Sequence, residues 1–136
     1  MIAAAGRDRH AALQRMTRGL VCIVDDDLSM REALSSLLRS MDFAVETFDS
    51  AAAFLAANAA ELGLCLILDV CMPEMNGLEL QQRLRDMGAR IPIVFMTARP
   101  DKQMEARALA AGAVAFLTKP LDNDALLAAL ESSLAP

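Results

Sequence analysis

The stretch LCLILDVCMPEMNG, residues 64–77, decides the fold class and points to a site. Its first five residues are apolar, which is typical of a strand that is buried on both faces of a sheet. Asp69 ends the apolar run, and a turn rich in Pro, Asn and Gly follows at once. A carboxylate at this position is held on a rigid element, and we expect it to be open to solvent.

Three other apolar runs are also followed by polar or charged side chains. These are residues 20–24 before Asp25 and Asp26, residues 91–96 before Thr97, and residues 114–117 before Thr118 and Lys119. A fifth, short strand is expected over residues 43–48. The chain therefore offers acids, a hydroxyl and an amine at the ends of four strands.

Helical patterns separate these strands. The first helix is expected over residues 28–41, and the second begins after a cap at Asp49 or Ser50. The third runs from Asn76-Gly77 to Gly88, the fourth covers residues 100–111, and the last runs from about Asp122 to the end. Strand and helix thus alternate five times, and the strands are nearly continuous apolar runs. This combination predicts a parallel α/β fold with helices on both faces of the sheet.

The parallel arrangement predicts where the polar groups meet. With right-handed crossovers all strands point the same way, so their carboxyl ends share one edge of the sheet, where open α/β sheets bind ligands. Carboxylates gathered there repel one another and favour a divalent cation. Oxygen ligands suit Mg²⁺ better than Zn²⁺. A carboxylate, a hard cation, a hydroxyl and an ammonium group together can handle a phosphoryl group, with one carboxylate free to act as nucleophile.

Composition limits the classes of function. The 136 residues, 55% of them apolar, are enough for one domain with its own core. Thirteen basic against eighteen acidic residues give a net charge of −5, which disfavours broad binding of nucleic acid or an anionic membrane by this chain. No apolar stretch approaches the roughly twenty residues of a membrane span, and no secretory signal is expected.

The three cysteines, Cys22, Cys65 and Cys71, lack the spacing of a metal site. We expect them to be buried as small apolar residues in a reducing compartment, which favours a cytoplasmic location. Residues 1–18 show no clear core pattern and are expected to form a mobile tail, so that the domain covers residues 19–134.

Four motifs occur in a specific order and spacing. They are Asp25-Asp26-Asp27 with Arg31, Asp69 with Met72-Pro73 and Asn76-Gly77, Thr97-Ala98, and Lys119-Pro120. Together they closely resemble the receiver domain of two-component response regulators. The resemblance implies a flavodoxin-like (βα)5 fold, a doubly wound five-stranded parallel sheet with strand order 2-1-3-4-5. It also implies a signalling domain that catalyses only its own phosphotransfer and autodephosphorylation.

The resemblance also implies roles for individual residues. Asp69 matches the phosphoacceptor, Thr97 the switch hydroxyl, and Lys119 the lysine that contacts the phosphoryl group. The implied ligands of Mg²⁺ are Asp25, Asp26, Asp69 and the backbone carbonyl of Cys71, with Asp25 acting partly through water. Phe116 matches the aromatic switch position, and Cys71 and Arg99 match positions that tune the lifetime of the phosphoryl group.

The partners implied by the resemblance are a histidine kinase or a phosphotransfer protein. A homodimer through the face made by residues 100–111, 114–117 and the last helix is also implied. The resemblance does not specify which partner or effector domain receives the signal, because the chain fits either a single-domain regulator or the receiver portion of a longer protein. No direct nucleic-acid contact and no membrane contact are expected of it.

Two alternatives remain. In a phosphatase of the haloacid-dehalogenase type, Asp25 would be the nucleophile and Asp27 the acid, but Asp69 before Met72-Pro73 would be unexplained. A receiver-like binding module could also work without phosphorylation, although Asp26, Asp69, Thr97 and Lys119 are all present.

Overall fold

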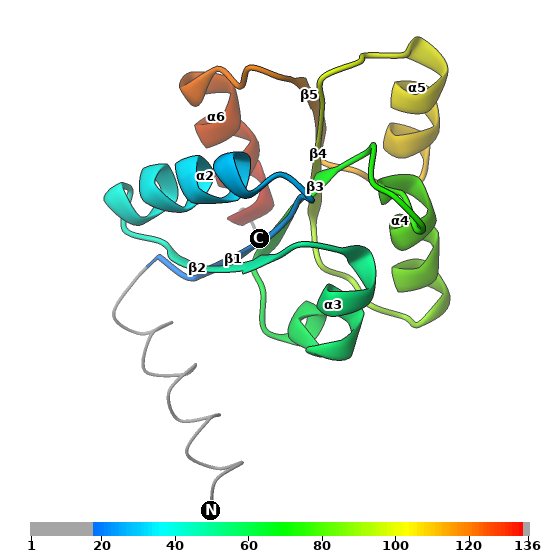
Figure 1. Cartoon of the computed structure of the whole chain (residues 1–136), viewed down its shortest axis with the longest axis horizontal. Coiled ribbons are helices and arrows are strands. Elements are labelled where there is room, and N and C mark those ends of the chain that lie inside the picture. Colours follow the sequence, from blue (N-terminus) through cyan, green and yellow to red (C-terminus); the bar gives the residue numbers. More distant parts are fainter. Residues whose placement is uncertain (1–17, 135–136) are drawn as a thin grey trace, which may run out of the picture.

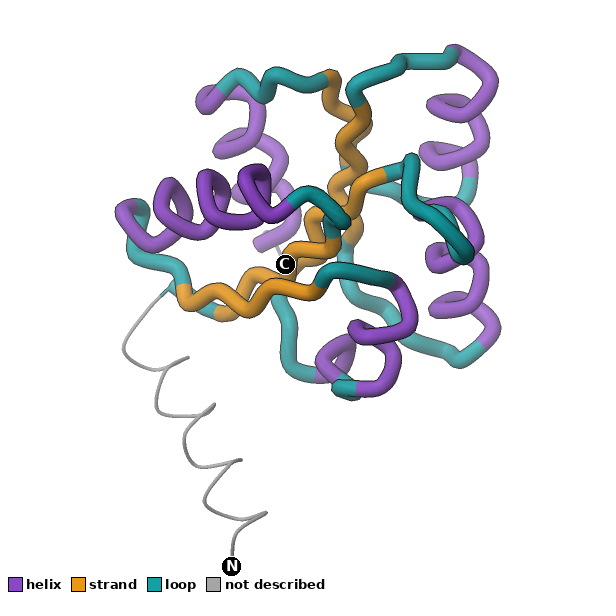
Figure 2. The backbone as a smooth tube through the Cα atoms, viewed as in Figure 1, coloured by secondary structure: helices purple, strands orange, loops and turns teal. Residues whose placement is uncertain are grey.

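The computed structural model describes residues 18–134, in which five strands alternate with helices (Figures 1 and 2). The elements are β1 (Leu20–Val24), α2 (Leu28–Ser40), β2 (Ala44–Phe48), α3 (Ala51–Ala56), the short 3-10 helix η1 (Ala59–Glu61), β3 (Cys65–Asp69), α4 (Gly77–Asp86), β4 (Ile93–Thr97), α5 (Lys102–Ala110), β5 (Ala115–Thr118) and α6 (Asn123–Leu134). Apart from Arg18, the tail expected over residues 1–18 lies outside the described residues.

The five strands form one parallel sheet in the order β2-β1-β3-β4-β5. This confirms the flavodoxin-like doubly wound fold and its strand order. The central strand β3 pairs with β1 on one side and with β4 on the other. The carboxyl ends of these three strands are therefore neighbours, as the sequence predicted.

Helices cover both faces of the sheet. Figure 1 shows α2 and α6 on one side and α3, α4 and α5 on the other. Alternate strand residues supply the two cores: Cys22, Leu66 and Phe95 lie in the core with α3, α4 and α5. Ile23 and Ile67 lie in the core with α2 and α6. Burial on both faces explains why β1, β3 and β4 are continuous apolar runs.

Side-chain caps fix where the helices begin. Asp27 caps α2 by accepting a hydrogen bond from the Ser29 N–H at 2.9 Å, and Asn76 begins α4 in a capping box with Glu79. Helix α5 starts at Lys102, two residues later than expected, because Asp101 accepts hydrogen bonds from the first-turn N–H groups. The cap at Asn76 thus fixes where the β3–α4 turn ends.

The start of α4 packs directly over the end of β3. A Cβ atom at Gly77 would lie 2.5 Å from the carbonyl oxygen of Asp69, so no larger residue fits without a shift. The Gly77 N–H donates to the carbonyl of Val70 at 2.9 Å. This close approach closes the turn that carries the candidate site. Among residues 18–134, no helix is long and apolar enough to cross a membrane.

Candidate functional site

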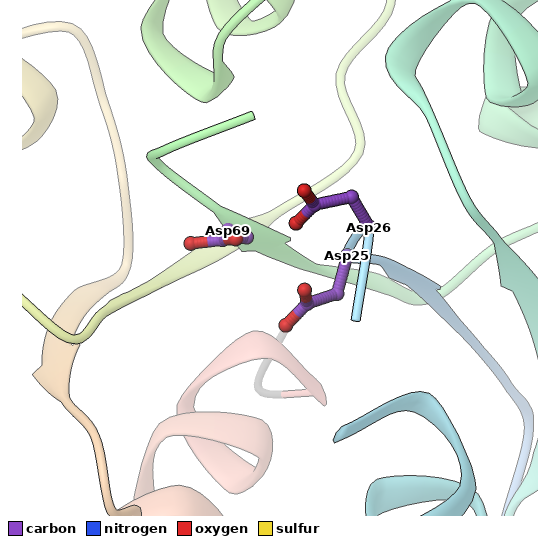
Figure 3. A group of neighbouring side chains, drawn as sticks. All are labelled: Asp25, Asp26 and Asp69. Atoms are coloured by element: carbon purple, nitrogen blue, oxygen red, sulfur yellow. The ribbon is translucent and has the colours of Figure 1, made fainter. Parts of the chain in front are cut away.

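Three carboxylates meet at the carboxyl edge of the sheet. They belong to Asp25, Asp26 and Asp69 (Figure 3). One carboxylate oxygen from each residue lies within 4.8 Å of the oxygens from the other two. They come together because Val24 pairs with Leu68, which places the residues that end β1 and β3 side by side. All donors are hard oxygens, so the group fits Mg²⁺ rather than a soft metal.

The three acids differ in exposure. Asp25 is completely buried and Asp69 is 4% exposed, whereas Asp26 is exposed. The expectation that Asp69 is open to solvent was therefore wrong. The reason is local: the Asp69 carboxyl group lies against the Lys119 ammonium, the Cys71 N–H and the other two acids. Asp26 is the member of the group that faces solvent.

Asp25 has partners for each of its polar groups. Its Oδ2 lies 2.9 Å from the Lys119 Nζ, and its Oδ1 accepts a hydrogen bond from the Asp27 N–H at 2.9 Å. Its own N–H donates to the carbonyl of Phe48. Its carbonyl oxygen accepts a hydrogen bond from the Arg31 guanidinium at 2.8 Å. Asp25 therefore organises the site, and its carboxylate is already neutralised by an ammonium group.

Lys119 joins two of the acids. Its Nζ lies 2.9 Å from Asp25 and 3.7 Å from the Asp69 Oδ2, and its backbone N–H donates to the carbonyl of Thr97. Burial lowers the pKa of the ammonium, but the hydrogen bond to Asp25 and the charges of Asp69 and Asp25 outweigh burial and raise the pKa above its usual value. Lys119 is therefore a fixed positive charge at the site.

The Asp69 carboxyl group binds its proton more tightly than an ordinary aspartate. Burial, and then the negative charge of Asp25, raise its pKa from 3.8 to about 6, although Lys119 and the Cys71 N–H act in the opposite direction. That N–H lies 3.3 Å from the Asp69 Oδ1. The metal-free site thus disfavours the ionised carboxylate, and a cation beside it would relieve this cost.

Thr97 and its neighbours form a second group next to Asp69. The Thr97 side chain is fully buried, and its Oγ1 accepts a hydrogen bond from the Arg99 N–H at 3.1 Å and lies 4.0 Å from the Cys71 Sγ. The Arg99 side chain is exposed. Cys71 is also exposed, contrary to the expectation, because it follows β3 in the turn. The other two cysteines are buried as expected.

Phe116 lies one strand further along the sheet. It pairs with Phe95 across β4 and β5, and the centroids of the two rings are 6.0 Å apart. The ring is partly buried against the core below α5. The structure thus brings Asp25, Asp26, Asp69 and Lys119 together, places Thr97 and Cys71 beside them, and puts Phe116 farther out. The roles of these residues remain predictions.

One contact of the site, from Arg31 to Asp25, was not predicted from the sequence. Arg31 belongs to the first motif, but it received no role, and the structure places its guanidinium on the Asp25 carbonyl. The signal was its position in the first turn of the helix that follows the acidic cluster.

Comparison with known proteins identifies the family. Residues 21–131 match the response regulator receiver domain family. The response regulator protein TodT of Pseudomonas putida is 47% identical over 116 residues, which are 85% of this chain and 51% of TodT. The solved structure of the response regulator StyR is 51% identical, with a TM-score of 0.79 over 85% of this chain and 58% of that chain.

The chain belongs to the receiver domains of two-component response regulators. The structure of FixJ-N is also similar, with 37% identity and a TM-score of 0.76 over 85% of this chain and 92% of that chain. Receiver domains are signalling domains of two-component phosphorelays, so the phosphatase alternative is not favoured. The chain spans about half the length of TodT and of two other curated relatives that it matches, TmoT and TdiR.

Proposed function

We propose that the chain takes a phosphoryl group onto Asp69 from the phosphohistidine of a histidine kinase or phosphotransfer protein. The observation that carries this proposal is the pairing of a nearly buried carboxylate with Lys119 at 3.7 Å and with two further acids within 4.8 Å. In the transfer, an Asp69 oxygen forms a bond to phosphorus as the phosphorus–nitrogen bond breaks, and the electron pair of that bond stays on the imidazole.

The residues around Asp69 would have separate roles in the transfer. Lys119 would contact an oxygen of the transferred group, because its ammonium already lies between Asp25 and Asp69. Asp26, Asp69 and the backbone carbonyl of Cys71 would hold Mg²⁺, with Asp25 acting partly through water. Bound Mg²⁺ supplies neutralisation of the negative charge that develops on the phosphoryl oxygens.

The response to phosphorylation would run from Thr97 to Phe116. The Thr97 hydroxyl is held by the Arg99 backbone, and a new phosphoryl oxygen on Asp69 would compete for it. Phe116 would repack as Thr97 moves, which would change the face made by α5, β5 and α6. That face is the proposed surface for a homodimer or an output partner. Cys71 and Arg99 would set how long the phosphoryl group lasts against attack by water.

The proposal is tested with beryllofluoride and Mg²⁺, which imitate a phosphoryl group on a carboxylate. Amide signals of Asp69 and Thr97 are followed by nuclear magnetic resonance in the wild type, in Asp69→Asn and in Asp49→Asn. Asp49 is a matched control, because it is an exposed aspartate directly after β2. The wild type and Asp49→Asn should respond, and Asp69→Asn should not. An unchanged response in Asp69→Asn would place the phosphoacceptor elsewhere.

A further inference from the structure

Arg31 touches the acidic site through the backbone rather than through a carboxylate. It lies in the first turn of α2 and is partly buried. Its Nη1 donates a hydrogen bond to the Asp25 carbonyl oxygen at 2.8 Å. A guanidinium donor makes a short and strong hydrogen bond of this kind. Arg31 therefore fixes the backbone directly after the end of β1.

The peptide that Arg31 holds is the one that leads into Asp26. The Asp25 carbonyl and the Asp26 N–H belong to one planar peptide unit, so fixing the oxygen also fixes the direction in which Asp26 leaves the strand. On the other side, the Asp27 N–H is held by the Asp25 Oδ1 at 2.9 Å, and the Asp27 carbonyl accepts from the Arg31 N–H at 3.1 Å. Asp26 is thus clamped at both flanking residues.

The Asp26 side chain itself has no such support. Among residues 18–134 it makes no hydrogen bond and no ion pair, and it is exposed. The placement of its carboxylate near Asp69 therefore depends on the backbone on either side of it. A side chain held in this indirect way is sensitive to the loss of its outer support.

We propose that Arg31 is a positioning residue for Mg²⁺ binding, which orients Asp26 toward Asp69 by holding the Asp25–Asp26 peptide. This inference rests on the proposed Mg²⁺ site. It predicts a change in Mg²⁺ affinity on removal of Arg31 that is opposite in direction to the change expected from charge alone. If Arg31 acted only as a nearby positive charge, its removal would strengthen the binding of a cation. If it positions Asp26, its removal weakens binding.

The experiment measures Mg²⁺ affinity of the unphosphorylated full chain, without any phosphodonor. Because the chain has no Trp or Tyr, the titration follows the amide signals of residues 25–27 by nuclear magnetic resonance. Arg31→Met removes the charge and the donors while retaining much of the side-chain length. Arg31→Lys retains the charge and a single donor nitrogen. Arg39→Met is the matched control, because it removes an exposed arginine from the other end of α2.

The expected result is about tenfold or greater weakening of Mg²⁺ binding in Arg31→Met, the usual effect of removing an outer partner of a metal ligand. Arg31→Lys should retain most of the affinity, and Arg39→Met should bind as the wild type does. Thermal unfolding without metal checks that each variant folds. Should Arg31→Met fail to fold, Arg31→Gln is measured in its place with the same expectation.

Equal or tighter Mg²⁺ binding after loss of Arg31 would overturn the inference, provided that the wild type binds Mg²⁺ and Asp26→Asn does not. That outcome would leave the proposed function intact. Failure of the wild type to bind Mg²⁺ at all would instead overturn the proposed Mg²⁺ site, and the inference with it.

Discussion

Asp69→Asn should make the metal-free protein more stable, because it removes a charge that the fold disfavours. The pKa of Asp69 rises from 3.8 to about 6 on folding, mainly because the carboxyl group is buried and secondly because Asp25 is near. At about 1.4 kcal/mol per pKa unit, this rise corresponds to ~3 kcal/mol of free energy of unfolding. Asparagine has nearly the same shape, and its Oδ1 can still accept from the Cys71 N–H. We therefore expect a gain of about 2–3 kcal/mol at neutral or higher pH.

The gain should depend on pH in a defined direction. The folded pKa lies above the unfolded one, so the cost of ionising Asp69 is fully present above a pH of about 6 and is lost as the pH falls toward 3.8. The wild type should thus approach the stability of Asp69→Asn as the pH is lowered through this window. Mg²⁺ should likewise stabilise the wild type and have little effect on the variant.

The assay is urea unfolding followed by far-ultraviolet circular dichroism, in the presence of a chelator, at about pH 8 and about pH 5. Asp49→Asn serves as the control and should change stability by less than ~0.5 kcal/mol at both values. If Asp69→Asn is no more stable than the wild type at the higher pH, or if its gain is the same at both, the account of the Asp69 environment is wrong.

Three further perturbations test the surroundings of the site. Gly77→Ala should lower the free energy of unfolding by about 1–3 kcal/mol in thermal or urea unfolding, since its Cβ would lie 2.5 Å from the backbone oxygen at the end of β3; wild-type stability would contradict the packing described. Lys119→Met should destabilise the metal-free protein by about 3 kcal/mol, because it leaves the fully buried Asp25 without its ammonium partner, and an increase in stability would refute this. Thr97→Ala should still bind beryllofluoride and Mg²⁺ but should leave the Phe116 ring signals unchanged, whereas a wild-type shift of that ring would show that the hydroxyl does not couple the two.

The fold and the grouping of the acids could be predicted from the sequence, since both depend on the order of apolar strands and helices along the chain. Continuous apolar strands alternating with helices require a parallel sheet, and parallel strands bring Asp25 and Asp69 to one edge. Helix starts could be predicted where the cap was recognised, as at Ser50, which accepts from the Ala53 N–H. The start of α5 was placed too early because the cap at Asp101 was not recognised.

The exposure of individual side chains could not be predicted in the same way. Neither the end of a strand nor the turn after it has a periodicity that indicates how deeply a side chain is buried. Asp69, the last residue of β3, was therefore expected to be exposed and Cys71 to be buried, and both expectations were wrong. The contact from Arg31 to the Asp25 carbonyl was also missed. It depends on the angle at which α2 leaves the loop, which residue spacing does not specify.

The most direct test of the central claim is the location of the covalent phosphoryl group. The protein is treated with acetyl phosphate and Mg²⁺, the acyl phosphate is trapped by borohydride reduction, and the modified residue is identified by mass spectrometry of its peptides. We expect modification of Asp69 alone, with none when Mg²⁺ is removed. Modification of Asp25 or Asp26 in place of Asp69, or of no aspartate under conditions where Mg²⁺ binds, would contradict it.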